Sequence, residues 1–324
     1  MQPNDIGNTS AVIANSAPVS RQHRKSVVMG SLAMLASTLF FASMHACVRY
    51  LSGDLHPFEI AFFRNLLGVL ILIPFAIKAG TSVLKTQHFN LHLIRASFNV
   101  VAMLVFFYAL SITPLALVQA LSFTAPLFTT ILAVFFLGEI VRLRRWAAII
   151  VGFIGVLIIL RPGVEPIQLG AVLVMCSAAI WAMTMIVIKK LSNTDSALTI
   201  TLYVSLFLTL FSFLPALIFW EWPEGVQWLW LLAIALLGTS GQLCLAKAFS
   251  YADATLVLPI DFAKIIWGAL FGYWFFAEAV DSLTWLGAII VFGGACYLAW
   301  RERQLEKDSR LQTQSIAATV KSPD

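Results

Sequence analysis

The stretch 109-ALSITPLALVQALSFTAPLFTTILAVFFLGEIVRLRRWAAIIVGFIGVLIIL-160 carries the pattern that decides the fold of this chain. Two apolar runs, 114–137 and 143–160, are separated by the short break 138–142, and three arginines at 142, 144 and 145 lie around the start of the second run. Each run is close to the ~20 residues that a helix needs to cross the hydrocarbon core of a bilayer. The stretch therefore predicts two membrane-spanning helices joined by a short charged loop.

The same pattern returns 139 residues later in the chain. Placing 109–160 over 248–299 without a gap gives twelve identical residues in 52 positions. The ungapped register, more than the level of identity, indicates that the chain contains two related halves. The matched pairs include Ser111/Ser250, Phe123/Phe262, Glu139/Glu278, Trp146/Trp285 and Gly155/Gly294.

Apolar runs of similar length fill most of the remaining chain. Of all residues, 60% are hydrophobic and 11% are charged, against about 25% charged in ordinary soluble domains. Hydropathy alone allows nine to eleven spans. Of these counts we predict ten, so the predicted fold class is an all-α integral membrane protein with ten transmembrane helices. The runs lie near 27–51, 57–77, 92–111, 114–137, 143–160, 167–190, 196–219, 227–249, 254–276 and 282–300.

Positive charge distinguishes the two sides of the predicted membrane domain, because cytoplasmic loops are enriched in Lys and Arg. With ten spans and a cytoplasmic amino terminus, the other side has only Arg49 and Arg161 as basic residues, each at a helix end. Both termini are therefore expected in the cytoplasm. The thirteen basic residues on the cytoplasmic side are Arg21, Arg24, Lys25, Lys78, Lys85, Arg142, Arg144, Arg145, Lys189, Lys190, Arg301, Arg303 and Lys307.

The repeat and the charges together predict the domain organisation. Five helices per half is an odd number, so the second half must enter the bilayer from the opposite side. Inverted repeats of this kind are typical of secondary transporters. The expected segments are a cytoplasmic polar tail 1–25, a first repeat 26–163, a second repeat 164–302 and a cytoplasmic polar tail 303–324.

Several function classes find no support in the sequence. The net charge of +5 sits at the ends of apolar runs and not on a basic face with interleaved aromatics, so no nucleic-acid partner is expected. The four cysteines lie far apart without a CxxC pair, which predicts neither a disulfide framework nor a metal site. Metalloprotease, nucleophile-elbow and phosphate-loop motifs do not occur. The chain is expected not to be an enzyme and to need no cofactor.

Charged residues inside the predicted spans are the main candidates for a binding site, because they are costly to insert and usually face a polar interior or a partner. Asp261, Lys264 and Trp267 follow one another at steps of three in the ninth span, so one helix face would present a carboxylate, an amine and an indole. The alternative is that the carboxylate only neutralises a basic neighbour and fixes two helices together. Its basic neighbours are Lys264, Lys247 and Arg95.

Polar side chains on other spans extend the candidate substrate site. Arg95 and Asn99 start a polar stripe on the third span, although Arg95 alone would also suit the membrane interface. His45 on the first span is a candidate ligand for the solute, or a structural hydrogen-bonding group. The remaining candidates are Gln119, Trp181 and Gln242. Residues assigned to gating or ion pairing are Lys247, Arg64 and Glu59.

Short segments at equivalent places in the two halves carry a family resemblance. Phe136-Leu137-Gly138-Glu139 and Phe276-Ala277-Glu278 are each followed by a Trp and a glycine-containing apolar helix, and a further segment is Ala248-Phe249-Ser250-Tyr251-Ala252-Asp253-Ala254. Over about 26–302 the chain resembles the EamA family of the drug/metabolite transporter superfamily, which implies ten helices in two EamA domains. His56-Pro57-Phe58-Glu59-Ile60-Ala61-Phe62-Phe63-Arg64 and Ala125-Pro126-Leu127-Phe128 are similar to a bacterial branch with S-adenosylmethionine and riboflavin carriers.

These observations predict a secondary transporter in the bacterial inner membrane. It would move a small polar or amphipathic metabolite by alternating access, with proton coupling through Asp261 as one mechanism. Two other classes stay open, namely a channel or facilitative pore and a non-transporting membrane scaffold. The expected partners are a small-molecule solute and the lipid bilayer, and the expected assembly is a monomer or homodimer.

Overall fold

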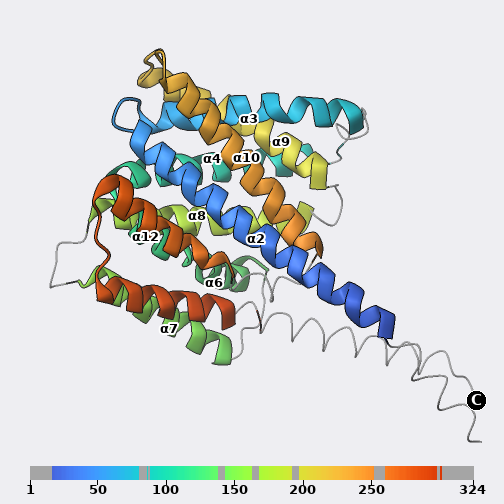
Figure 1. Cartoon of the computed structure of the whole chain (residues 1–324), viewed down its shortest axis with the longest axis vertical. Helices are drawn as coiled ribbons and strands as arrows, with labels where there is room; N and C mark the ends of the chain where they lie inside the picture. The colour runs from blue at the N-terminus through green and yellow to red at the C-terminus, as the bar shows by residue number, and fades with distance from the viewer. Residues whose placement is uncertain are drawn as a thin grey trace, which may run out of the picture.

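The computed structural model describes residues 17–79, 86, 88–137, 143–162, 168–191, 197–251, 260–297 and 300, and within them every regular element is a helix (Figure 1). The first half contributes α2 (Ala17–Leu51), α3 (Pro57–Ala79), α4 (Phe89–Ile112), α5 (Leu115–Ser122), α6 (Ala125–Leu137) and α7 (Leu143–Leu160). The second half contributes α8 (Leu169–Leu191), α9 (Ala197–Ile218), α10 (Gln227–Tyr251), α12 (Ala263–Phe276) and a last helix over Ser282–Tyr297.

The lengths of these helices confirm the predicted all-α membrane fold. Six apolar segments are long enough to cross a bilayer. Four shorter apolar helices accompany them, and each of the ten predicted runs overlaps one of these ten segments. The six are Val28–Leu51, Pro57–Pro74, Phe89–Ile112, Leu115–Leu132, Leu169–Val187 and Gln227–Leu245, and the four are Trp146–Leu160, Leu202–Ile218, Ala263–Phe276 and Ser282–Tyr297.

The outer faces of the helices are apolar, as a lipid environment requires. Large aliphatic side chains such as Leu70 on α3, Ile150 on α7 and Leu229 on α10 are exposed. Soluble proteins rarely expose contiguous apolar patches on this scale. The exposed apolar surface and the apolar helices together describe a multi-pass membrane protein.

The fourth predicted span differs from the expectation, because it consists of two helices instead of one. α5 ends at Ser122 and α6 begins at Ala125. Pro126 has no N–H to donate to the carbonyl of Ser122 four residues earlier, and its ring crowds that carbonyl. The chain closes the gap with tighter i to i−3 bonds, from Phe123 N to Ala120 O and from Thr124 N to Leu121 O.

Helices of the two halves pack against each other throughout the molecule. α2 packs along α10, α4 along α8, and α3 along α9, while α12 contacts both α2 and α5. Figure 1 shows α2 between α10 and α12. The large hydrophobic core accordingly draws residues from both halves, such as Met103 on α4 and Ile234 on α10. Any interior site between these helices is therefore built by both halves.

α7 and the last helix cross at glycines that allow close backbone contact. A Cβ added to Gly155 would lie 2.8 Å from the carbonyl oxygen of Gly287. A Cβ added to Gly294 would lie 3.1 Å from the carbonyl oxygen of Ala148. Small residues permit such close approach between membrane helices. Side chains larger than hydrogen at these two positions would push the helices apart.

His56, in the turn between α2 and α3, predicts a pH-dependent stability. Its ring stacks on Phe219 with centroids 3.7 Å apart, and the N–H of Phe58 donates to its Nδ1 over 3.3 Å. Burial lowers the pKa of His56 below its ordinary value of 6.5. Folding thus favours the neutral ring, so this contribution is complete above about pH 6.5 and is lost as the pH falls toward the folded pKa.

We expect the melting temperature of the wild type to fall more on acidification than that of His56→Phe. Phenylalanine keeps a ring that can stack on Phe219 but cannot take a proton. Thermal unfolding in detergent, followed from neutral pH to about pH 5, measures the two slopes. Equal slopes would show that His56 does not contribute to the pH dependence.

Candidate functional site

The interior of the bundle contains an ion pair at the start of α12. Lys264 Nζ lies 2.6 Å from Asp261 Oδ1, and the two side chains are only 20% and 17% exposed. The same ammonium group lies 5.3 Å from the ring centroid of Phe41 on α2, within the range of a cation–π contact. The structure therefore brings together the two charges that the sequence singled out, and it adds an aromatic face from the first helix.

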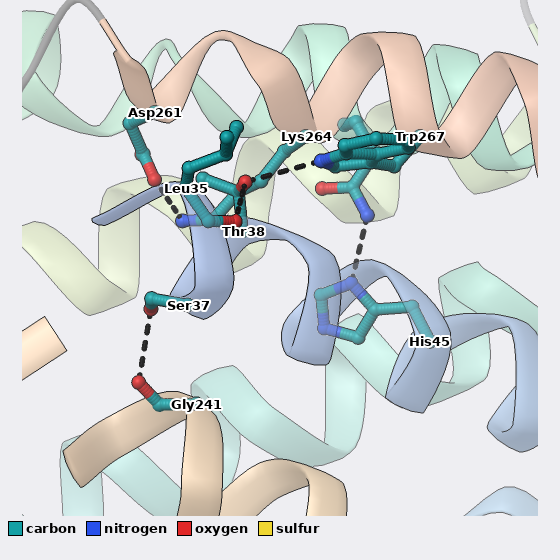
Figure 2. Close-up of polar contacts among 9 residues, drawn as sticks. Leu35, Ser37, Thr38, His45, Gly241, Asp261, Lys264 and Trp267 are labelled. Carbon is teal, nitrogen blue, oxygen red and sulfur yellow. Dashed lines mark hydrogen bonds and ion pairs between the residues drawn. The ribbon is translucent and has the colours of Figure 1, made fainter. Parts of the chain in front are cut away.

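Trp267 joins α12 to α2 one turn beyond this pair. Its indole Nε1 donates to the hydroxyl oxygen of Thr38 over 3.2 Å. The hydroxyl of Thr38 in turn donates to the backbone carbonyl of Leu35 over 2.7 Å. Figure 2 shows Asp261, Lys264 and Trp267 on the side that faces α2. A hydrogen-bonded indole is held in place, so its ring presents a fixed aromatic surface.

A second polar contact links α2 to α5. The side-chain amide Nε2 of Gln119 lies 2.8 Å from Nδ1 of His45 (Figure 2). The imidazole also contacts the ring of Phe106 on α4, with centroids 5.2 Å apart. Gly268 makes this arrangement possible, because a Cβ there would lie 2.9 Å from Cγ of Gln119. Three polar or aromatic side chains from three helices thus meet beside α12.

α10 packs against α2 on the side opposite to α12 (Figure 1). The hydroxyl of Ser37 donates to the carbonyl oxygen of Gly241 over 2.9 Å (Figure 2). Gly241 also lies against the ring of Phe41, since a Cβ there would come within 3.3 Å of it. This packing fixes the ring that faces Lys264.

The site lies where the chain interrupts its helices. Phe123 stands between α5 and α6, and Phe262 stands immediately before α12. Their ring centroids are 6.2 Å apart, and both rings contact Phe292, at 5.3 Å and 4.5 Å. Discontinuous helices are a common feature of binding sites in transporters.

One end of this interior is closed by a buried ion pair that the sequence reading did not anticipate. Arg49 at the end of α2 pairs with Glu278 and donates to the carbonyl of Thr113. Glu278 Oε2 also accepts a hydrogen bond from the N–H of Leu115 at the start of α5, over 2.9 Å. The guanidinium lies 5.1 Å from the ring centroid of Phe276. These contacts join α2, α5 and the end of α12.

A second ion pair lies at the same end of the molecule. Arg161, which follows α7, pairs with Asp281, which precedes the last helix. The carboxylate side chain is 47% exposed, in contrast to 13% for Glu278. The two pairs therefore differ in burial, and only the first is screened from solvent on both sides.

The other predicted site residues occupy different positions. Arg95 and Asn99 are buried on α4. Trp181 is half-buried on α8, and Gln242 and Lys247 are exposed on α10. Among the described contacts, no hydrogen bond joins Asn99, Trp181 or Gln242 to the Asp261 cluster. Their part in the site stays a prediction.

Glu59 and Arg64, expected as an ion pair or gate, are not paired with each other. The two residues are five positions apart, so they point to different faces of α3. Within the described residues, the buried carboxylate of Glu59 makes no hydrogen bond of good geometry, although the backbone of Glu221 lies close enough to interact with it. Arg64 instead donates to Asn65. The gating role assigned to them is therefore not supported by a contact between them.

Thr38 and the Arg49–Glu278 pair are the contacts that sequence reasoning missed. Thr38 is an inconspicuous hydroxyl in an apolar run. In the sequence, Arg49 stands out only as a basic residue at a helix end and Glu278 only as a residue matched in the repeat, although two opposite charges at helix ends on the same side indicate a possible ion pair. Within the described residues, no three His, Cys, Asp or Glu side chains gather as a metal site would require.

Together, a lipid-facing exterior, a polar interior shared by both halves and interrupted helices define a membrane carrier. The chain belongs to the EamA-like transporter family, whose profile matches residues 28–161 and 168–300. The predicted family resemblance is thereby confirmed.

Several curated proteins of bacteria are similar over most of the chain. An S-adenosylmethionine uptake transporter of Rickettsia bellii is 34% identical over 79% of this chain and 88% of its own length. A riboflavin transporter of Vibrio cholerae is 33% identical over 88% and 97%. A pseudopaline exporter of Pseudomonas aeruginosa is 31% identical over 80% and 92%. One crystal structure, 21% identical, covers 87% of this chain and 99% of its own with a TM-score of 0.56, which supports the fold.

Proposed function

We propose that this secondary transporter moves a small amphipathic metabolite with a flat ring across the bacterial inner membrane by alternating access. The observation that carries the proposal is the convergence of Lys264, Trp267 and His45 with their partners on α2, α5 and α12. Polar and aromatic groups from both halves meet there in the interior of the bundle. Ligand sites of this kind combine ring surfaces with a few fixed polar groups.

Reciprocal hydrogen bonds support the proposal that the two halves are inverted repeats. Ser37 on α2 donates to the carbonyl of Gly241 on α10, and Ser177 on α8 donates to the carbonyl of Ala102 on α4. Ala102 and Gly241 are 139 positions apart, which is the shift of the sequence repeat, and the two serines are 140 apart. The first helix of each half thus bonds to the third helix of the other.

The crossing of α7 with the last helix supports the same symmetry. Gly155 faces the carbonyl of Gly287, and Gly294 faces the carbonyl of Ala148. Shifting either contact by 139 residues produces the other. A pseudo-two-fold axis relates the halves in this proposal, and exchange of their conformations would open the interior alternately to each face.

The charges of the candidate site do not follow this repeat. Asp261, Lys264 and Trp267 correspond, at the shift of 139, to uncharged residues of the first half. The architecture therefore does not require an ion pair at this position. This asymmetry favours a role for the pair in binding over a purely architectural one. The corresponding residues are Ser122, Ala125 and Phe128.

The ion pairs at Glu278 and Asp281 support an assignment of the conformation. The positive-inside rule places this end of the molecule outside the cytoplasm, with both termini inside. The pairs Arg49–Glu278 and Arg161–Asp281 then hold the external side closed. In this proposal the solute reaches the site from the cytoplasmic face, and the pairs separate when the external face opens.

The relatives suggest the class of cargo. S-adenosylmethionine and riboflavin each join a flat nitrogen heterocycle to a polar chain. The rings of Trp267, Phe41 and Phe106 provide surfaces on which such a heterocycle would stack, next to the charges of Asp261 and Lys264. Reversible protonation of Asp261 would couple transport to a proton gradient.

Counterflow in proteoliposomes tests the proposal. Vesicles preloaded with unlabelled S-adenosylmethionine or riboflavin are expected to accumulate the labelled compound transiently and with saturation. Trp267→Ala should lower the initial rate about fivefold, because stacking contributes on the order of 1 kcal/mol. The matched control Trp222→Ala alters an exposed indole and should leave the rate unchanged.

Other results would favour another class of protein. Linear flux without counterflow would identify a channel, and no flux with either compound would remove the proposed cargo class. Intact stability combined with no flux of any solute would point to a scaffold.

A further inference from the structure

Arg64 is a charged residue on α3 that the candidate site does not use. Its Nη1 donates to Asn65 Oδ1 over 3.1 Å and approaches Met103 Sδ at 3.6 Å. Asn65 itself is held by Met103 and by Ser212 on α9, each 3.4 Å from its Nδ2. The guanidinium carbon lies 6.0 Å from the ring centroid of Phe107. Neutral groups therefore surround this charge.

No carboxylate balances Arg64 within the described residues. The ion pairs there are Arg49–Glu278, Arg161–Asp281 and Lys264–Asp261. The Nε of Arg64 is buried and has no hydrogen-bond partner in the part of the chain that the structure describes. An arginine offers five N–H donors, and an unbalanced charge in a membrane interior is costly and marks a functional group by default.

The guanidinium belongs to the same interior as the candidate site. Met44, which precedes His45 on α2, and Arg64 on α3 both lie against Gly238. Asp261 already neutralises Lys264. Of the two positive charges, Lys264 and Arg64, the charge of Arg64 is therefore the one that no carboxylate of the described residues neutralises.

A glycine keeps the neighbouring face of α10 bare. A Cβ on Gly238 would lie 3.3 Å from Nε of Arg64 and 3.5 Å from its Nη2. On that side the guanidinium lies beside the bare backbone of Gly238 and near the thioether of Met44, and neither supplies a negative charge.

We infer that Arg64 binds an oxyanion group of the cargo, a carboxylate or a phosphate. The inference rests on the proposed function and narrows it to cargo with an anionic group, which S-adenosylmethionine carries as a carboxylate and which riboflavin lacks. The planar fork of a guanidinium matches both oxyanions in a bidentate manner. With the ring bound beside Trp267 and His45, the anionic end of the cargo would point along α2 toward α3.

Charge-selective thiol labelling tests this inference without knowledge of the cargo. Met103→Cys is introduced into a chain whose four native cysteines are replaced by serine. Its reaction with an anionic sulfonatoethyl methanethiosulfonate is compared with that of the cationic trimethylammonium reagent. We expect the anionic reagent to be favoured at least about tenfold relative to the reference Trp222→Cys, an exposed position outside the candidate site, because a fixed charge concentrates counter-ions.

Variants of Arg64 and its neighbour identify the source of the selectivity. Arg64→Gln should abolish the preference for the anionic reagent, whereas Arg64→Lys should retain it. Asn65→Asp provides a second test in which the arginine stays in place, because a carboxylate beside it cancels its charge. Equal labelling by both reagents, a preference that survives Arg64→Gln and Asn65→Asp, or no reaction at Met103→Cys would each overturn the inference.

Protection from labelling distinguishes the two oxyanions. Succinate and inorganic phosphate are added at equal concentration, and the one that slows the reaction at Met103→Cys more is the preferred group. Protection by neither would contradict the inference. The labelling needs no transport, so its failure is distinguishable from a failure of the counterflow experiment.

Discussion

Lys264→Gln should lower transport by at least about 100-fold and destabilise the protein by about 3 kcal/mol. The substitution leaves the carboxylate of Asp261 in a largely buried position without its partner, and removing one member of a buried ion pair costs this much. Asp261→Asn should be destabilising for the converse reason. Thermal unfolding and initial transport rates in proteoliposomes measure the two effects.

The double variant Asp261→Asn/Lys264→Gln separates binding from structure. Removal of both charges eliminates the unpaired group, so stability should recover by a kcal/mol or more. If the charges contact the cargo, transport stays low despite this recovery. Recovery of both stability and transport would assign the pair a structural role. A normally inserted Asp261→Asn variant that keeps full transport and its response to a proton gradient would remove Asp261 from the site.

Glu278→Gln should shift the protein toward the externally open state by about tenfold or more. The amide oxygen can still accept the N–H of Leu115, but the attraction to Arg49 is lost. Charge-assisted hydrogen bonds contribute about 1.5–3 kcal/mol, and a difference of 1.4 kcal/mol changes a population tenfold. Transport would fall because the externally open conformation becomes so stable that the return to the other conformation is slow.

The native Cys47 on α2 reports this shift. With the other three cysteines replaced by serine, its labelling by an impermeant maleimide from the external side should accelerate in Glu278→Gln. Asp281→Asn is the matched comparison and should accelerate the labelling of Cys47 much less, because Asp281 is half exposed and exposed ion pairs contribute less than about 1 kcal/mol. Unchanged labelling of Cys47 would contradict a closing role for Glu278.

The helices could be predicted from the sequence because the bilayer fixes their length and polarity. Apolar runs of about 20 residues bounded by charges can form few structures other than membrane-spanning helices. The division of the fourth span at Phe123 was not predicted. It depends on Pro126, and a proline within an apolar run is compatible with a kink, a break or a tolerated bend in a membrane helix. Local sequence does not choose among these outcomes.

The candidate site could be predicted only in part. A sequence shows which residues are charged, but it does not show which residues they contact in the fold. Asp261 and Lys264 were found because they are three residues apart on one helix, where contact follows from helical geometry. The contacts of Thr38 with Trp267 and of Arg49 with Glu278 join residues 229 positions apart in each case. Such pairs depend on how distant helices pack.

The hydrogen bond between Gln119 and His45 determines which polar groups the site can offer. The amide Nε2 of Gln119 can only donate, so Nδ1 of the neutral imidazole accepts and the ring proton resides on Nε2. His45 therefore presents a donor on its other edge. Lys264 is likewise a donor without acceptor capacity. Complementarity then requires a cargo rich in acceptors on this side, such as ring nitrogens or carbonyl oxygens, and methylation of those atoms should abolish recognition.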